Sequence, residues 1–162
     1  MKAYKINDWL GWGGVHDIAH KTQEYDVVIN VGIKQGISVH GKICRNNYFE
    51  DSPSGFRYDI ITALAKEIED YRKEGKKVFV NCHEGNSRSV SLVLAWMTMF
   101  GGYETTEAAF DALFKVKQWV TYDGIETQSK QPLRDWFQKE WPLYLAIHRG
   151  TGQWVPETKV AS

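Results

Sequence analysis

The chain has 162 residues, with 20 lysine or arginine residues against 20 aspartate or glutamate residues, and 43% of its residues are hydrophobic. This length and composition are typical of one globular domain, and they exclude a disordered chain, a collagen-like repeat and a disulfide scaffold. Because the formal net charge is +0, no overall positive field attracts nucleic acid or an anionic membrane, so an anionic ligand must be bound locally.

Strand and helix signals alternate along the first half of the chain. Residues 26–31 form a β-branched apolar run that predicts a buried strand. Residues 36–49 alternate loosely and predict one or two short strands or an irregular connection, and 51–55 have the composition of a loop. Apolar residues three and four positions apart predict an amphipathic helix over 58–73, and residues 77–81 predict a second buried strand.

The second half of the chain is dominated by helical patterns. Residues 82–88 form a polar loop, and the apolar run over 89–100 predicts a buried helix that ends at two glycines. Residues 105–117 predict another amphipathic helix. Pro132 can start a further helix, which Pro142 is expected to kink or break.

Strands that alternate with helices predict an α/β fold in which helices flank a central, mostly parallel sheet. No repeat or linker interrupts the pattern, so we expect one domain over residues 1–150 and a flexible tail over 151–162. The N-terminus lacks the apolar run of a signal peptide, and no apolar run is long enough to cross a bilayer. Two cysteines, Cys44 and Cys82, cannot make a disulfide framework, which predicts a cytoplasmic location.

The loop over 82–88 carries the residues expected to do chemistry. It joins a buried strand to a buried helix, and the N–H groups of such a turn and of the helix N-terminus bind anions. Gly85 allows a backbone conformation that a side chain would forbid, and Arg88 offers a planar fork for two phosphate oxygens. The same field favours thiolate over thiol at Cys82, and Ser89 is placed to donate to the sulfur. We therefore expect Cys82 to be a nucleophile at the base of a phosphate site.

The segment Cys82-His-Glu-Gly-Asn-Ser-Arg-Ser89 resembles the signature loop C-x2-G-x2-R-[S/T] of the cysteine-dependent phosphatases. Its G-x-S-R-S form is most similar to the dual-specificity protein phosphatases, and the likeness extends over residues 27–117. The resemblance implies the same α/β fold, no metal or other cofactor, and catalysis by Cys82, Arg88 and Ser89. It also implies that the loop residues bind the substrate phosphate: His83, Glu84, Gly85, Asn86, Ser87 and Arg88.

The resemblance implies a general acid on a loop about thirty residues before the cysteine, which places this role on Asp51. A positioned acid protonates the leaving oxygen and contributes about 10²–10⁴-fold to the rate. Glu50 and Asp59 are the competing carboxyl groups. Because the acid must be protonated for the first step, mildly acidic pH should favour the reaction.

Three features leave questions open. The family has a histidine before the catalytic cysteine, but this chain has Asn81, which cannot carry charge. Cys44 is either a small core residue or a partner of Cys82 in a protective disulfide. The remaining histidines are scattered without metal-ligand spacing, so no metal site is expected.

The expected function is hydrolysis of phosphotyrosine and phosphoserine or phosphothreonine in proteins, through a phosphocysteine intermediate. The variable loop positions carry no lysine or arginine, which disfavours phosphoinositides and RNA 5′-phosphates without excluding them. The chain is also shorter than the tyrosine-specific phosphatase domains, whose deep pocket excludes phosphoserine. The expected partner is a phosphorylated protein, with no nucleic acid and no membrane, and a non-catalytic module that binds phosphoproteins is the remaining alternative.

Overall fold

A computed structural model describes residues 3–117 and 133–151 of the chain. Five strands make up its sheet: β1 (Tyr4–Lys5), β2 (Leu10–Gly13), β3 (Val27–Asn30), β4 (Ile43–Asn46) and β5 (Val78–Asn81). The helices are α1 (Ile18–Lys21), α2 (Tyr58–Lys73), α3 (Arg88–Met99), α4 (Thr106–Val116) and α5 (Asp135–Thr151).

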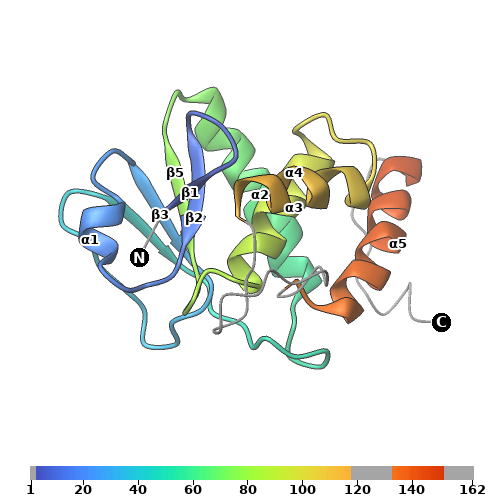
Figure 1. Cartoon of the computed structure of the whole chain (residues 1–162), viewed down its shortest axis with the longest axis horizontal. Coiled ribbons are helices and arrows are strands. Elements are labelled where there is room, and N and C mark those ends of the chain that lie inside the picture. Colours follow the sequence, from blue (N-terminus) through green and yellow to red (C-terminus); the bar gives the residue numbers. More distant parts are fainter. Residues whose placement is uncertain (1–2, 118–132, 152–162) are drawn as a thin grey trace.

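The strand order in the sheet is β1-β2-β5-β3-β4. The short edge strand β1 runs antiparallel to β2, and every other neighbouring pair is parallel. Helices α2 to α5 gather on one side of the sheet and α1 lies on the other (Figure 1). The predicted α/β fold, with helices that flank a mostly parallel sheet, is confirmed.

The main core lies between the sheet and helices α2 to α5. Strand β5 sends Val78 and Val80 into this core and Phe79 to the opposite face, where a smaller cluster contains Tyr25 and Val28. Helix α3 lies at the centre of the larger layer, with every residue from Ser89 to Thr98 buried. Because α3 is fixed on all sides, its N-terminus is a rigid support for the loop that precedes it.

Two parts of the fold differ from the sequence prediction. No strand was predicted before residue 26, yet β2 pairs with β5 inside the sheet, and its short run Leu10-Gly-Trp-Gly13 is fully buried. The expected break at Pro142 is wrong, because α5 continues through this residue. Pro142 lies on the exposed side of α5, where its ring does not disturb the buried contacts of Trp141 and Tyr144. Pro132 and the tail over 152–162 lie outside the described residues.

Three asparagines align at the carboxyl ends of the parallel strands β5, β3 and β4. Asn30 is fully buried and stands opposite both Asn81 and Asn46 in the sheet register. It accepts from the Asn81 amide at 3.1 Å and donates to Asn46 Oδ1 at 2.9 Å. Its oxygen also accepts from the N–H groups of Gly32 and Ile33. This asparagine ladder therefore fixes the chain where it leaves the sheet beside the loop over 82–88.

We predict that Asn30→Ala lowers the free energy of unfolding by about 2–4 kcal/mol, because it leaves several buried donors without an acceptor. Asn46→Ala is the matched comparison, since Asn46 is exposed and water replaces its lost contacts. Urea unfolding followed by circular dichroism measures both variants. Equal losses in the two variants would contradict the role assigned to the buried member of the ladder.

Candidate active site

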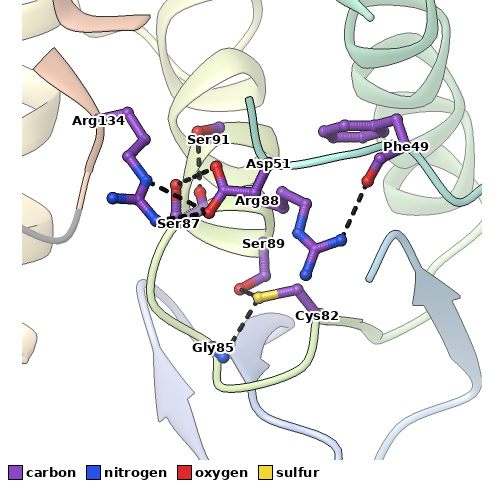
Figure 2. A network of polar contacts seen from close by, with 9 residues as sticks. All are labelled: Phe49, Asp51, Cys82, Gly85, Ser87, Arg88, Ser89, Ser91 and Arg134. Atoms are coloured by element: carbon purple, nitrogen blue, oxygen red, sulfur yellow. Dashed lines mark hydrogen bonds and ion pairs between the residues drawn. The ribbon is translucent and has the colours of Figure 1, made fainter. Parts of the chain in front are cut away.

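The loop over 82–88 closes on the sulfur of Cys82. Strand β5 ends at Asn81 and α3 begins at Arg88, so the loop connects two buried elements. The Gly85 N–H donates to Cys82 Sγ at 3.2 Å, and Ser89 Oγ lies 3.2 Å from the same sulfur (Figure 2). Polar hydrogens directed at a sulfur stabilise its negative charge, so this environment suits a thiolate.

The loop takes this shape because glycines let three backbone segments approach one another. Gly85 has a φ of 77°, and a Cβ at this position would lie 2.5 Å from the carbonyl carbon of Gly13. A Cβ on Gly32 would lie 2.5 Å from Cys82 Cα. Val15, two residues after the end of β2, donates its backbone N–H to the His83 carbonyl at 3.0 Å. The N-terminal segment that follows β2 is thus part of the support of the loop.

The N-terminus of α3 carries no side-chain cap. Ser87 occupies the N-cap position, but its hydroxyl makes no capping hydrogen bond and instead donates to Asp51 Oδ1 at 3.1 Å. Arg88 is half-buried, and its Nη1 donates to the carbonyl of Phe49 at 3.0 Å. The Arg88 guanidinium also lies 5.7 Å from the ring centroid of Tyr48. The segment before Asp51 therefore holds Arg88 next to the loop, while the N-terminal dipole of α3 adds partial positive charge there.

Asp51 reaches the site from the connection between β4 and α2. Its Oδ2 accepts from Arg134 at 3.3 Å from Nε and 3.2 Å from Nη2, while Ser87 holds the other oxygen (Figure 2). The competing carboxyl groups lie elsewhere. Glu50 does not line the cavity, and Asp59 is paired with Arg57 through two hydrogen bonds, which hold the pKa of Asp59 below its usual value.

These side chains surround one cavity of about 140 Å³. Its lining contains most of the predicted site residues: Asp51, Cys82, His83, Glu84, Asn86, Ser87, Arg88 and the unpredicted Arg134. Ser89 and Gly85 do not line the cavity, and both contact the sulfur of Cys82. His83 and Glu84 are exposed at the rim, where they also border a second depression beside Gly14, Val15 and His16.

Sequence reasoning missed Arg134, which lies after the undescribed residues 118–132 and just before α5. No local motif marks this arginine, because only the packing of α5 brings it to Asp51. Gly32 was also missed, although a glycine directly after a buried strand is a usable signal for close backbone approach.

The structure places Asn81 on the face of the sheet opposite to the Cys82 sulfur. Its amide donates to Asn30, and its buried Oδ1 has no partner among the described residues. Asn81 thus orients the end of β5 through a neutral amide and adds no charge beside the sulfur.

Cys44 and Cys82 also lie on opposite faces of the sheet. Cys44 packs against the cluster that contains Val28 and Phe79, and its sulfur accepts from the Val39 N–H at 3.3 Å. Cys82 belongs to the main core, and both thiols are free. A disulfide between them would require the sheet to open, so the structure favours the interpretation of Cys44 as a packing residue.

Neither a metal-binding cluster nor a membrane-spanning helix is present in residues 3–117 and 133–151. No group of three or more histidine, cysteine, aspartate or glutamate side chains is arranged to hold a metal ion there. No helix in these ranges has the length and apolar character needed to span a bilayer.

The sequence model of the family described as "Dual specificity phosphatase, catalytic domain" matches residues 17–129, which is more than half of the chain. The chain belongs to this family. The matched range includes Asp51 and the whole loop over 82–88, so the candidate site lies inside the dual specificity phosphatase domain.

One curated relative agrees with this assignment. Protein-tyrosine-phosphatase MKP1 of Arabidopsis thaliana is 30% identical over 114 residues, which cover 64% of this chain. The match spans only 14% of the length of that curated relative.

Two solved structures share the fold. The human tyrosine phosphatase-like serine/threonine/tyrosine-interacting protein superposes with a TM-score of 0.70 at 18% identity, and the match covers 91% of this chain and 98% of that one. The PTP-2 phosphatase of Cydia pomonella gives a TM-score of 0.61 at 22% identity, covering 72% and 80% of the two chains.

We predict that Gly85→Ala weakens tungstate binding about tenfold or more and destabilises the domain, because the new methyl group meets the Gly13 backbone. Gly75→Ala is the matched control, since Gly75 has a φ of 76° but open space around it. The control isolates the cost of the left-handed conformation, about 1 kcal/mol, and should leave tungstate affinity unchanged. Isothermal titration with tungstate and thermal unfolding test both variants, and wild-type tungstate affinity in Gly85→Ala would contradict the role of this close contact.

Proposed function

We propose that this domain hydrolyses phosphotyrosine and phosphoserine or phosphothreonine in proteins through a phosphocysteine intermediate. One observation carries the proposal: the sulfur of Cys82, the guanidinium of Arg88 and the carboxylate of Asp51 converge on a single cavity of about 140 Å³. That volume suits the phosphoryl group of a substrate whose protein part stays outside.

In the binding step, the loop N–H groups and Arg88 hold the phosphate dianion over Cys82. The hydrogen bond from Arg88 to the Phe49 carbonyl uses one N–H of the guanidinium. Other N–H groups of its planar fork can donate to phosphate oxygens. The uncapped N-terminus of α3 contributes further partial positive charge. Binding is local, which is consistent with a chain whose formal net charge is +0.

In the first chemical step, the Cys82 thiolate attacks phosphorus. A sulfur–phosphorus bond forms, the bond from phosphorus to the ester oxygen breaks, and protonated Asp51 gives its proton to that oxygen. Before the attack, the Ser89 hydroxyl and the Gly85 N–H stabilise the thiolate. Ser87 and Arg134 hold the Asp51 carboxyl group at the edge of the cavity, so its position is already set before the substrate binds.

In the second step, water attacks the phosphocysteine. The Asp51 carboxylate accepts a proton from this water, the sulfur–phosphorus bond breaks, and inorganic phosphate leaves with Cys82 restored as thiolate. Ser89 stabilises the departing sulfur from 3.2 Å. Preorganised N–H donors and Arg88 supply most of the stabilisation of the transition state, because uncatalysed phosphate monoester hydrolysis is extremely slow.

The rim of the cavity favours a phosphorylated protein over polyphosphorylated lipids or RNA. His83 and Glu84 are exposed at the variable positions, and neither is lysine or arginine. A carboxylate at the rim repels a substrate that carries several phosphates. The alternatives are a phosphoinositide or RNA 5′-phosphate as substrate, and a non-catalytic module that binds phosphoproteins, and the experiments below distinguish them.

We further propose that residues 1–150 form a single phosphatase domain and that the protein is cytoplasmic. The shared main core of the sheet and helices α2 to α5 supports the first point. The two free cysteines are consistent with a reducing compartment.

We predict that Cys82→Ser abolishes turnover of an aryl phosphate and of phosphopeptides, because serine cannot provide a thiolate. Arg88→Ala should lower kcat/KM by about 10³-fold or more, since a buried phosphate then lacks its charged fork. Steady-state kinetics with the purified protein measure both.

Cys44→Ser is the matched control, because it removes the other thiol from the opposite face of the sheet, and it should retain activity. Full activity in Cys82→Ser would overturn the mechanism. Absence of turnover in the wild type, with phosphopeptide binding retained, would favour the binding module. A preference for inositol phosphates over phosphopeptides would favour the lipid substrate.

We predict that Asp51→Asn lowers kcat by about 10²–10⁴-fold on an alkyl phosphate and far less on an activated aryl phosphate, which leaves without a proton. The variant should also lose the basic limb of the pH–rate profile, since that limb reports loss of the acid's proton. Asp59→Asn is the control and should behave as the wild type. If the leaving group made no difference to the loss in Asp51→Asn, the acid would have to be another residue.

A further inference from the structure

Lys117 contacts the loop over 82–88 but is not among the residues that line the cavity. It follows the last residue of α4, and its Nζ donates to the Gly85 carbonyl at 3.2 Å and to Asn86 Oδ1 at 2.5 Å. The same ammonium lies 4.6 Å from the ring centroid of Tyr4 on the edge strand β1. Lys117 does not line the cavity, so it does not contact a bound phosphate directly.

The hydrogen bond to the Gly85 carbonyl bears on phosphate binding through the geometry of the peptide unit. In a trans peptide the C=O and the following N–H point in opposite directions. A Gly85 carbonyl that faces Lys117 therefore turns the Asn86 N–H away from Lys117, and Asn86 is one of the residues that line the cavity. The contact with Asn86 Oδ1 fixes the same residue a second time.

The ammonium of Lys117 is in an environment of mixed charge. Burial lowers its pKa from 10.5 to about 8, and the positive charge of Lys21 acts in the same direction. The charges of Cys82 and Glu84 act in the opposite direction and favour the protonated form. Lys21 itself donates to the Gly14 carbonyl at 3.2 Å, on the segment that supports the loop. Lys117 is half-buried and interacts electrostatically with Cys82, whereas Lys66 is a solvated surface lysine.

We propose that Lys117 is a positioning residue for the phosphate loop, one that holds the Gly85 carbonyl outward and the Asn86 N–H inward and adds a positive charge behind Cys82. This inference rests on the proposed function, because it assigns the loop to phosphate binding. Tyr4 shields the ammonium from water on the far side, so the edge strand β1 takes part in the same arrangement.

The position of Lys117 gives the site a pH dependence of its own. At neutral pH the ammonium is charged and the loop is held. As pH rises through about 8, the amine loses its proton and the charge behind Cys82 disappears. Oxyanion affinity should therefore fall in this range, and the fall should persist in Asp51→Asn.

The test compares Lys117→Met and Lys117→Arg by tungstate binding between about pH 6 and pH 10, with folding checked by circular dichroism. Tungstate remains a dianion across this range, so the titration reports the protein. Lys117→Met should bind tungstate about tenfold more weakly than wild type at neutral pH and show no further fall near pH 8. Lys117→Arg should bind as the wild type at neutral pH and hold that affinity through pH 9, because the guanidinium stays charged. Lys66→Met is the surface control and should match the wild type.

Wild-type affinity in Lys117→Met would overturn the proposal. An equal loss in Lys117→Arg and Lys117→Met would also overturn it, because charge would then be irrelevant. If Lys117→Met fails to fold, Lys117→Gln gives a second test: this neutral variant should also bind tungstate more weakly than wild type at neutral pH and show no fall near pH 8, and wild-type affinity in it counts against the proposal. Tungstate binding needs no turnover, so these outcomes are separate from the Cys82→Ser test of the proposed function.

Discussion

The site depends on the close approach of three backbone segments around the sulfur of Cys82. The end of β5, the turn after β2 and the turn after β3 meet where Gly85, Gly14 and Gly32 leave no room for side chains. This contact places the Gly85 N–H on the sulfur and leaves the first turn of α3 without a side-chain cap. The sheet and the buried helix α3 keep these segments in place, so the anion site exists before any ligand arrives.

The charges of the site are arranged locally rather than over the whole surface. Arg88 provides a cation at the cavity, Lys117 provides another outside the loop, and Arg134 is paired with Asp51. The exposed Glu84 adds a negative charge at the rim of the same cavity. This arrangement gathers positive charge at one cavity of a chain whose formal net charge is +0.

Much of the fold could be predicted because its central elements have strong patterns. The predicted helix over 58–73 coincides with α2, and the strands and helix around residues 27–30, 78–81 and 88–99 differ from expectation by one or two positions. Strand β2 could not be predicted, because alternating glycines in Leu10-Gly-Trp-Gly13 resemble a loop and its strand character comes from pairing with β5. The run through Pro142 was missed because proline normally ends or kinks a helix, whereas the core packing of Trp141 and Tyr144 supports α5 on both sides of this residue.

The loop residues of the site were predictable from one continuous segment, whereas its long-range partners were not. Cys82, Arg88 and Ser89 lie within one short segment of the sequence, and Asp51 was proposed from its spacing to Cys82. Arg134 and Lys117 reach the site from α5 and α4, and no spacing rule links them to the loop. Their placement is a consequence of tertiary packing, which a single sequence does not reveal.

The central claim is that Cys82 carries the phosphoryl group during turnover. The most direct measurement mixes the wild-type domain with a radiolabelled phosphopeptide, quenches separate samples in acid and in alkali, and maps the labelled peptide by mass spectrometry. We expect the phosphoryl group on the sulfur of Cys82, formed and lost fast enough to account for turnover. A label on the neighbouring His83, recognisable because phosphohistidine survives alkali but not acid, or turnover without any covalent species, would contradict the account.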